Sequence, residues 1–254
     1  MALDPPPRQL SAWFGTMTAL IRRFVVNCSL MADRLPESGI VFVVDDDVSM
    51  REALTGLLHS VGHRVTGLAS AQAFLSHPAP ILPACLLLDV RLPGLGGLDL
   101  QRELELRGLD IPIIFVTAHG DVQMAVRAMK AGAIEFLPKP FREQDVLDAV
   151  AGALEMSRCA QRRNQELATL RERYQTLSAR EREVMARLVK GMRNKQIAAD
   201  LHVSEVTVKV HRQRLLQKMH ATSLPTLAVM DFRLESSAER RGSSLSREGQ
   251  LTFR

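Results

Sequence analysis

Acidic, hydroxyl and ammonium side chains stand directly after short apolar runs in the N-terminal half of the chain. These side chains are Asp45, Asp46, Asp47, Asp89, Thr117 and Lys139. If the apolar runs are parallel strands, their carboxyl ends meet at one edge of a sheet. Carboxylates brought together repel each other unless a cation shares them, and such hard oxygen ligands suit Mg²⁺. Together with a hydroxyl and an ammonium group, they predict phosphoryl transfer in which a carboxylate is the nucleophile.

The elements that position these side chains alternate regularly. Ile40–Val44 is continuously apolar, as expected of a parallel strand covered on both faces. The predicted strands are Ile40–Val44, Arg64–Leu68, Ala84–Leu88, Ile113–Val116 and Ala133–Leu137. The predicted helices are Val48–Ser60, Ala71–Leu75, Leu98–Leu106, Val122–Ala131 and Asp145–Glu155. This alternation predicts an α/β fold with a doubly wound, five-stranded parallel sheet.

The charge of the chain is divided between its two halves. Residues 39–157 carry 9 Lys and Arg against 15 Asp and Glu, whereas residues 158–220 carry 15 against 6. An acidic module followed by a basic one indicates different partners, and nucleic acid is the natural partner of the second. No apolar run approaches the roughly 18–20 residues of a membrane helix, and the cysteines form no CxxC pair. These features predict a cytoplasmic protein with no membrane partner.

The basic half is predicted to be a small all-α domain with a helix-turn-helix. The predicted helices are Ala179–Lys190, Asn194–Leu201, Ser204–Met219 and Leu224–Leu234. Ser204 is a good N-cap for the third helix, in which Val208, Leu215 and Met219 would face the core. The outward face would then suit the major groove, because Lys and Gln can reach base edges and Val can contact thymine methyl groups. The residues expected to contact DNA are Lys195, Thr207, Lys209, Val210, Arg212, Gln213, Arg214 and Lys218.

The N-terminal half resembles the receiver domain of two-component response regulators. The segments that carry the resemblance are Val43–Asp47, Leu88–Gly94, Val116–Asp121 and Lys139–Phe141. The resemblance implies that Asp89 accepts a phosphoryl group and that Thr117 and Lys139 bind the phosphoryl oxygens. It also implies that Mg²⁺ is bound by Asp46, Asp89 and the backbone carbonyl of Arg91, with Asp45 completing the shell. Phe136 would be the switch aromatic, and the Lys139–Pro140 bond would be cis.

The C-terminal half resembles the helix-turn-helix of the LuxR/NarL type, in the order found in FixJ-type regulators. The segments that carry this resemblance are Leu177–Val184, Asn194–Ala198 and Val203–Arg212. In that family the residues at positions 209, 210 and 213 commonly face bases. Gln213 stands where a basic residue is frequent, so the base preferred at that position stays open.

The expected domain organisation follows from these segments. Residues 1–38 are predicted to be a disordered extension or an artefact of the start site, with translation beginning near Met31. Residues 39–155 would be the receiver, 156–174 a linker helix, 175–235 the DNA-binding domain and 236–254 a disordered tail.

The predicted function is that of a response regulator, not of an enzyme. A sensor histidine kinase would phosphorylate Asp89, and the switched surface would pair two chains into a homodimer or release the C-terminal domain. The phosphorylated chain would then bind double-stranded DNA and act with RNA polymerase, as an activator. One alternative is a constitutive DNA-binding protein whose receiver no longer signals. Another is an aspartyl-phosphatase of the haloacid-dehalogenase type, but that family has a second Asp two residues after the first, where this chain has Arg91.

Overall fold

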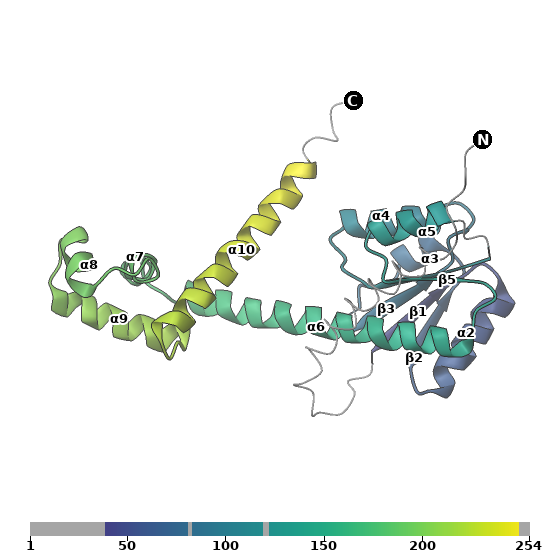
Figure 1. Cartoon of the computed structure of the whole chain (residues 1–254), viewed down its shortest axis with the longest axis horizontal. Helices are drawn as coiled ribbons and strands as arrows, with labels where there is room; N and C mark the ends of the chain where they lie inside the picture. The colour runs from purple at the N-terminus through teal and green to yellow at the C-terminus, as the bar shows by residue number, and fades with distance from the viewer. Residues whose placement is uncertain (1–38, 81–82, 119–121, 249–254) are drawn as a thin grey trace, which may run out of the picture. The chain divides into compact units, whose positions relative to one another are not determined.

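Five parallel strands form one sheet, in the order β2-β1-β3-β4-β5 (Figure 1). The computed structural model describes residues 39–80, 83–118 and 122–248. Our expectations for residues 1–38 and 249–254 therefore lie outside the described residues. The strands are β1 (Ile40–Val44), β2 (Arg64–Leu68), β3 (Ala84–Leu88), β4 (Ile113–Thr117) and β5 (Glu135–Pro138). Because the order reverses beside β1, the edge between β1 and β3 is the topological switch point, where ligands bind in such sheets.

Helices cover both faces of the sheet (Figure 1). One face packs against α2 (Val48–Ser60) and the N-terminal part of α6 (Glu143–Gln175). The other face packs against α3 (Ala71–Leu75), α4 (Gly97–Leu106) and α5 (Val122–Lys130). Both faces of the sheet are apolar because helices cover each of them. All five residues of β3 are accordingly buried.

A buried glutamine joins two of these helices. Gln101 of α4 is only 6% exposed, and its Nε2 donates to the carbonyls of Ala131 (2.9 Å) and Ala128 (3.3 Å). These carbonyls lie at the C-terminal end of α5, where the last carbonyls of a helix have no partner within the helix. Gln101 therefore fixes the end of α5 against α4.

The C-terminal part of the chain is helical. It contains α7 (Ala179–Leu188), α8 (Asn194–Asp200), α9 (Glu205–Met219) and α10 (Leu224–Glu248). One apolar cluster unites these helices with the last turns of α6, and Val208, Leu215 and Met219 are buried in it as predicted. Tyr174 packs at the edge of this cluster, with the Arg182 guanidinium 5.3 Å from the centre of its ring.

The strands and helices predicted from the sequence follow the order found in the structure, with three main differences. Strand β5 begins at Glu135, two residues later than predicted. The predicted receiver helix and linker helix form one helix, α6, because no Gly or Pro interrupts residues 153–175. Helix α10 continues to Glu248, past Ser236, where we expected a disordered tail. That expectation gave the Ser and Gly content more weight than the helix formers Ala, Glu and Arg in the same stretch.

The chain divides into two compact units, and the division falls between Gln161 and Arg162. Each unit has its own apolar core. Among the residues that the structure describes, no helix is both long and apolar enough to cross a bilayer.

Candidate functional site

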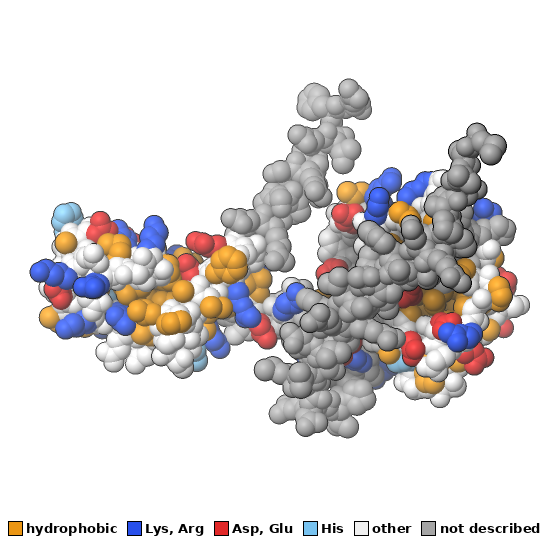
Figure 2. Space-filling model, in the orientation of Figure 1, with side chains coloured by type: hydrophobic (Ala, Val, Ile, Leu, Met, Phe, Trp, Pro, Cys, Tyr) orange, Lys and Arg blue, Asp and Glu red, His pale blue; other side chains and the backbone are white. Residues whose placement is uncertain are grey.

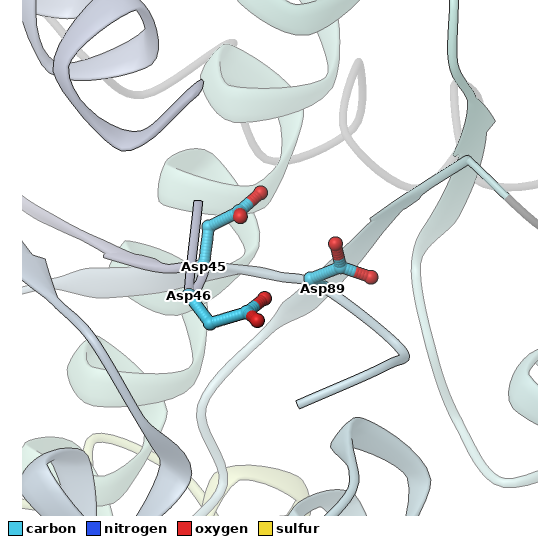
Figure 3. Close-up of side chains that lie close together, drawn as sticks. All are labelled: Asp45, Asp46 and Asp89. Atoms are coloured by element: carbon cyan, nitrogen blue, oxygen red, sulfur yellow. The ribbon is translucent and has the colours of Figure 1, made fainter. Parts of the chain in front are cut away.

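Asp45 and Asp89 lie side by side because their strands are neighbours in the sheet. Val44 pairs with Leu88 across β1 and β3, and the next residue of each strand is an aspartate. The Asp89 N–H donates to the Val44 carbonyl at 2.9 Å, which extends the pairing by one step. The two carboxylates therefore meet at the switch point of the sheet, as the strand-end pattern predicted (Figure 3).

Asp46 completes a group of three carboxylates at this edge (Figure 3). One oxygen of each of Asp45, Asp46 and Asp89 lies within 4.8 Å of the others. Asp45 is only 2% exposed and Asp89 9% exposed, whereas Asp46 is exposed to solvent. Oxygen donors of this number and spacing, open to water on one side, fit a divalent cation that keeps several waters, such as Mg²⁺.

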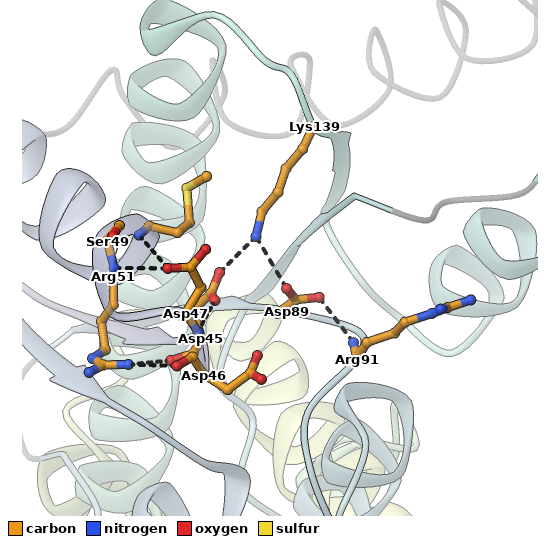
Figure 4. Close-up of polar contacts among 9 residues, drawn as sticks. Asp45, Asp46, Asp47, Ser49, Arg51, Asp89, Arg91 and Lys139 are labelled. Atoms are coloured by element: carbon orange, nitrogen blue, oxygen red, sulfur yellow. Dashed lines mark hydrogen bonds and ion pairs between the residues drawn. The ribbon is translucent and has the colours of Figure 1, made fainter.

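Lys139 provides the positive charge of the site (Figure 4). Its Nζ donates to Asp45 Oδ2 at 2.8 Å and to Asp89 Oδ2 at 3.2 Å. Burial alone would lower the pKa of Lys139, but its contacts with both aspartates raise that pKa above the usual 10.5. Burial raises the pKa of Asp45 above 3.8 despite its contact with Lys139. Ionising Asp45 therefore costs more than ionising a free aspartate, and a cation in the acidic group would lower that cost.

Thr117, Phe136 and the Lys139–Pro140 bond occupy the neighbouring strand ends. Thr117 ends β4 and is 1% exposed, and its carbonyl accepts the Lys139 N–H at 2.8 Å. The Lys139–Pro140 bond is cis, as the resemblance implied. The half-buried ring of Phe136 on β5 lies 6.3 Å from the ring of Phe115. The Arg91 N–H donates to Asp89 Oδ1 at 3.0 Å, so the backbone at Arg91 lies at the site.

Two further contacts beside this site were not predicted. Asp47 caps α2, since its Oδ1 accepts the N–H groups of Ser49 (2.9 Å) and Met50 (3.3 Å). Arg51 donates to the backbone carbonyl of Asp45 at 2.7 Å (Figure 4). The capping role has a sequence signal, an Asp directly before an amphipathic helix. The Arg51 contact has none, because it depends on where the helix crosses the end of β1.

The second candidate surface is the outer face of α9. Ser204 caps this helix by accepting the Thr207 N–H at 3.1 Å, as predicted. Val206 is 68% exposed and Val210 41% exposed. Basic side chains, blue in Figure 2, are spread over the visible face of this unit. Besides Val210, four residues predicted to contact DNA are exposed, namely Lys195, Lys209, Gln213 and Arg214.

Three predicted DNA-contacting residues have partners within the protein. Lys218 Nζ donates to Glu181 Oε2 at 2.7 Å and to the Thr176 carbonyl at 3.0 Å. Arg212 Nη1 donates to Asn194 Oδ1 at 3.4 Å. The Thr207 hydroxyl lies 2.8 Å from the Ser204 hydroxyl. The structure thus places Lys218 and Arg212 between helices of the unit, and a basic helix pattern alone does not reveal such contacts.

Comparison with known proteins identifies a family for each part of the chain. Residues 41–151 match the family model described as response regulator receiver domain, and residues 175–231 match that of bacterial regulatory proteins, luxR family. Nodulation protein W of Bradyrhizobium diazoefficiens is 50% identical over 78% of this chain and 88% of its own length. Transcriptional regulatory protein FixJ of Azorhizobium caulinodans is 45% identical over 77% of this chain and 93% of its own length. The solved structure of response regulator StyR matches with a TM-score of 0.70 and 45% identity, covering 77% of this chain and 99% of StyR.

Proposed function

This chain belongs to the two-component response regulators that join a receiver domain to a LuxR-type DNA-binding domain, and we propose that Asp89 is its phosphorylated residue. The family implies a kinase partner and DNA, and its members regulate transcription. The observation that carries the proposal is that Asp89 lies at a strand end within reach of both Lys139 and the other two carboxylates. Residues 39–155 would form the receiver, 156–174 the linker helix and 175–235 the DNA-binding domain.

The proposed chemistry uses side chains whose positions are described above. Asp45, Asp46, Asp89 and the backbone carbonyl of Arg91 would hold Mg²⁺, which when bound neutralises charge on the carboxylates and on the phosphoryl oxygens. An Asp89 oxygen attacks the phosphorus of the kinase phosphohistidine. As the O–P bond forms, the P–N bond breaks and its electron pair stays on the ring nitrogen, which takes a proton from water so that neutral imidazole leaves. Lys139 and the Thr117 hydroxyl donate to the phosphoryl oxygens and so stabilise the transferred group.

The first test is phosphorylation of the full chain by acetyl phosphate with Mg²⁺, followed on a phosphate-retarding gel. We expect a retarded band for the parent chain and for Asp110→Asn, an exposed aspartate away from the site that serves as matched control. Asp89→Asn should give no retarded band. No retardation of the parent, even with a panel of histidine kinases, would refute the assignment. Repeated hydrolysis of small phosphorylated substrates would instead support the phosphatase alternative, against our proposal that the chain is not an enzyme.

Phosphorylation would control DNA binding through the surface next to Phe136. Val122 and Val126 of α5 are 58% and 37% exposed, so α5 offers an apolar face at the edge of the receiver. A change at Thr117 and Phe136 would alter this face and pair two chains, and two α9 helices would then bind half-sites about one DNA turn apart. The paired chain would act in the cytoplasm as an activator, together with RNA polymerase.

The coupling is tested by binding to a selected DNA pool before and after phosphorylation, with the oligomeric state measured by light scattering. Tighter binding and a doubled mass, both lost in Asp89→Asn, would support the switch. Affinity that phosphorylation leaves unchanged would support the alternative of a constitutive DNA-binding protein with a non-signalling receiver.

A further inference from the structure

Arg51 contacts the backbone that carries two of the proposed metal ligands. Its Nη1 lies 2.7 Å from the Asp45 carbonyl oxygen and 3.5 Å from that of Asp46. Figure 4 shows the guanidinium on the side of this backbone away from Lys139 and Asp89. Within the described residues Arg51 makes no ion pair with a carboxylate, and its Nη1 donates to these two carbonyls alone.

These contacts hold both peptide groups next to Asp46. The Asp45 carbonyl belongs to the peptide before Asp46, and the Asp46 carbonyl belongs to the peptide after it. The second peptide is also held from its other side, because the Asp47 N–H donates to Asp45 Oδ1 at 2.9 Å. The direction of a Cα–Cβ bond follows from the two peptide planes that flank it. The direction of the Asp46 Cα–Cβ bond is therefore restrained by these backbone contacts.

Asp46 depends on this backbone more than the other two acidic residues do. Lys139 contacts the carboxylates of Asp45 and Asp89 directly. The Asp46 carboxylate is exposed and has no hydrogen-bond or ion-pair partner in the part of the chain that the structure describes. Without Arg51, Asp46 would lose a restraint that no side-chain contact replaces.

Gly67 of β2 provides the space through which Arg51 reaches these carbonyls. A Cβ at position 67 would lie 3.2 Å from Arg51 Cγ and 3.4 Å from its Cδ. A Cβ there would also lie 3.4 Å from Thr55 Oγ1, and none of these three nearest atoms belongs to an acidic residue of the site. Gly67 thus offers a second, independent way to displace the guanidinium.

We propose that Arg51 is a positioning residue for divalent-cation binding, which orients Asp46 through the Asp45 and Asp46 carbonyls. This inference rests on the proposed function of the acidic site. Arg suits the role because its guanidinium stays charged and can serve two acceptors in fixed directions. Groups that orient a metal ligand, without touching the metal, typically change metal affinity by about 10–100-fold when they are removed.

The test measures Mg²⁺ alone, by calorimetric titration into the full chain. We expect Arg51→Gln to weaken Mg²⁺ binding by about tenfold or more, since it cannot reach both carbonyls with a charged donor. Gly67→Val should weaken binding in the same direction while Arg51 is retained, and Arg51→Lys should fall between parent and Arg51→Gln. Arg102→Gln, at an exposed arginine of α4, is the matched control and should bind like the parent.

A purely structural role of Arg51 predicts a different result. In that case the variants would unfold at lower temperature in the presence of EDTA, but would bind Mg²⁺ within twofold of the parent, and the proposal would be overturned. Arg51→Lys and Gly67→Val decide the question if Arg51→Gln does not fold. In acetyl phosphate reactions we expect the Mg²⁺ concentration for half-maximal rate to rise while the rate at saturating Mg²⁺ stays the same.

The outcomes also separate this inference from the proposed function. If the parent binds Mg²⁺ and is phosphorylated, and Arg51→Gln binds Mg²⁺ equally well, only the role of Arg51 is refuted. If the parent binds no Mg²⁺ at millimolar concentration, both the role of Arg51 and the proposed acidic site are refuted.

Discussion

Three consecutive aspartates occupy three different environments at the end of β1. Asp45 is buried and contacts Lys139, Asp46 is exposed beside it, and Asp47 caps α2. The difference arises because β1 ends at Val44 and α2 begins at Val48, so each residue of the turn points in a different direction. Identical side chains thus have separate roles, and substitutions should separate those roles.

Asp47→Ala should destabilise the receiver unit by about 1 kcal/mol, because the N–H groups of Ser49 and Met50 lose their side-chain acceptor. Mg²⁺ affinity should stay within twofold of the parent, since Asp47 contacts the acidic group only through its backbone N–H. Urea denaturation and calorimetric titration measure the two effects. Asp47→Ser, which keeps a capping oxygen, should restore most of the stability. A large loss of Mg²⁺ binding in Asp47→Ala would contradict the assignment.

Glu181 gives the C-terminal unit a specific sensitivity to acid. Although burial would raise it, the pKa of Glu181 lies below the usual 4.5, because Lys218 and the Ser178 N–H donate to the carboxylate. An acid with a lowered pKa stabilises the fold above its unfolded pKa, and this stability is lost as the pH falls through the folded pKa. Glu181→Gln should cost about 1–3 kcal/mol at pH 7. The difference from the parent should shrink below pH 4.5, as measured by denaturant titrations at several pH values. A difference that is constant with pH would argue against this account.

Single residues show where inference from the sequence succeeds at this scale. Asp89 and Lys139 were predicted to meet because each lies just past the end of a predicted strand. The structure places Lys139 Nζ 3.2 Å from Asp89 Oδ2. The contact of Lys218 with Glu181 was not predicted, because 37 residues separate them and only the packing of α9 on α7 brings them together. Contacts between residues at strand ends could therefore be predicted from the sequence, whereas contacts that depend on how two helices pack could not.

At the scale of elements, patterns of apolar residues predicted most of the helices and strands. Continuous apolar runs identified β1 and β3, because strands buried on both faces have no polar positions. The half-buried edge strand β2 was predicted with the correct bounds despite its weaker pattern. Buried polar residues such as Gln101 could not be predicted, since a glutamine in an amphipathic helix normally faces solvent.

Gln101→Leu should destabilise the receiver unit by about 1–3 kcal/mol, because the Ala131 carbonyl loses its donor at the end of α5. Hydrogen exchange should show faster exchange at the C-terminal end of α5 than in the parent. Arg102→Leu, at the adjacent exposed position of α4, serves as a control and should leave that exchange unchanged. Unchanged exchange in Gln101→Leu would mean that the contact does not restrain α5.

The turn of the helix-turn-helix contains a residue in the left-handed conformation. His202 has φ 53° between α8 and α9, and its side chain is exposed. His202→Gly should therefore stabilise the C-terminal unit by about 0.5–1 kcal/mol, since glycine adopts this conformation without strain. His59→Gly, in the last turn of α2, should have the opposite sign, because glycine disfavours helix. Thermal denaturation measures the change in stability of both variants. A loss of stability in His202→Gly would show that the left-handed backbone of His202 is not strained.

At the scale of the whole molecule, the acidic and basic halves are separate units with separate chemistry. The division between Gln161 and Arg162 places the three carboxylates in one unit and the exposed face of α9 in the other. Opposite charge in the two halves suits a cation in the first and phosphates in the second. The two activities should therefore depend on salt in different ways.

DNA affinity should fall steeply with salt, and the slope of log K against log salt should change by about 0.9 for each phosphate contact removed. Arg214→Gln, at an exposed position of α9, should reduce the slope by about one. Lys218→Gln should change it less, because Lys218 contacts Glu181 and Thr176 within the unit. Fluorescence anisotropy at several salt concentrations gives these slopes. Equal slopes for Arg214→Gln and the parent would exclude a phosphate contact at Arg214.

The packing of Tyr174 in the C-terminal unit has an optical consequence. The chain contains one Tyr and one Trp, and the Trp is Trp13, outside the described residues. In a Trp13→Phe variant, Tyr174 would be the sole strong intrinsic fluorophore, and it lies on the C-terminal side of the division at Gln161. Its emission would follow the melting of that unit alone, while circular dichroism at helix wavelengths would follow both. Comparing the two signals would resolve two melting transitions in the intact chain without any attached dye.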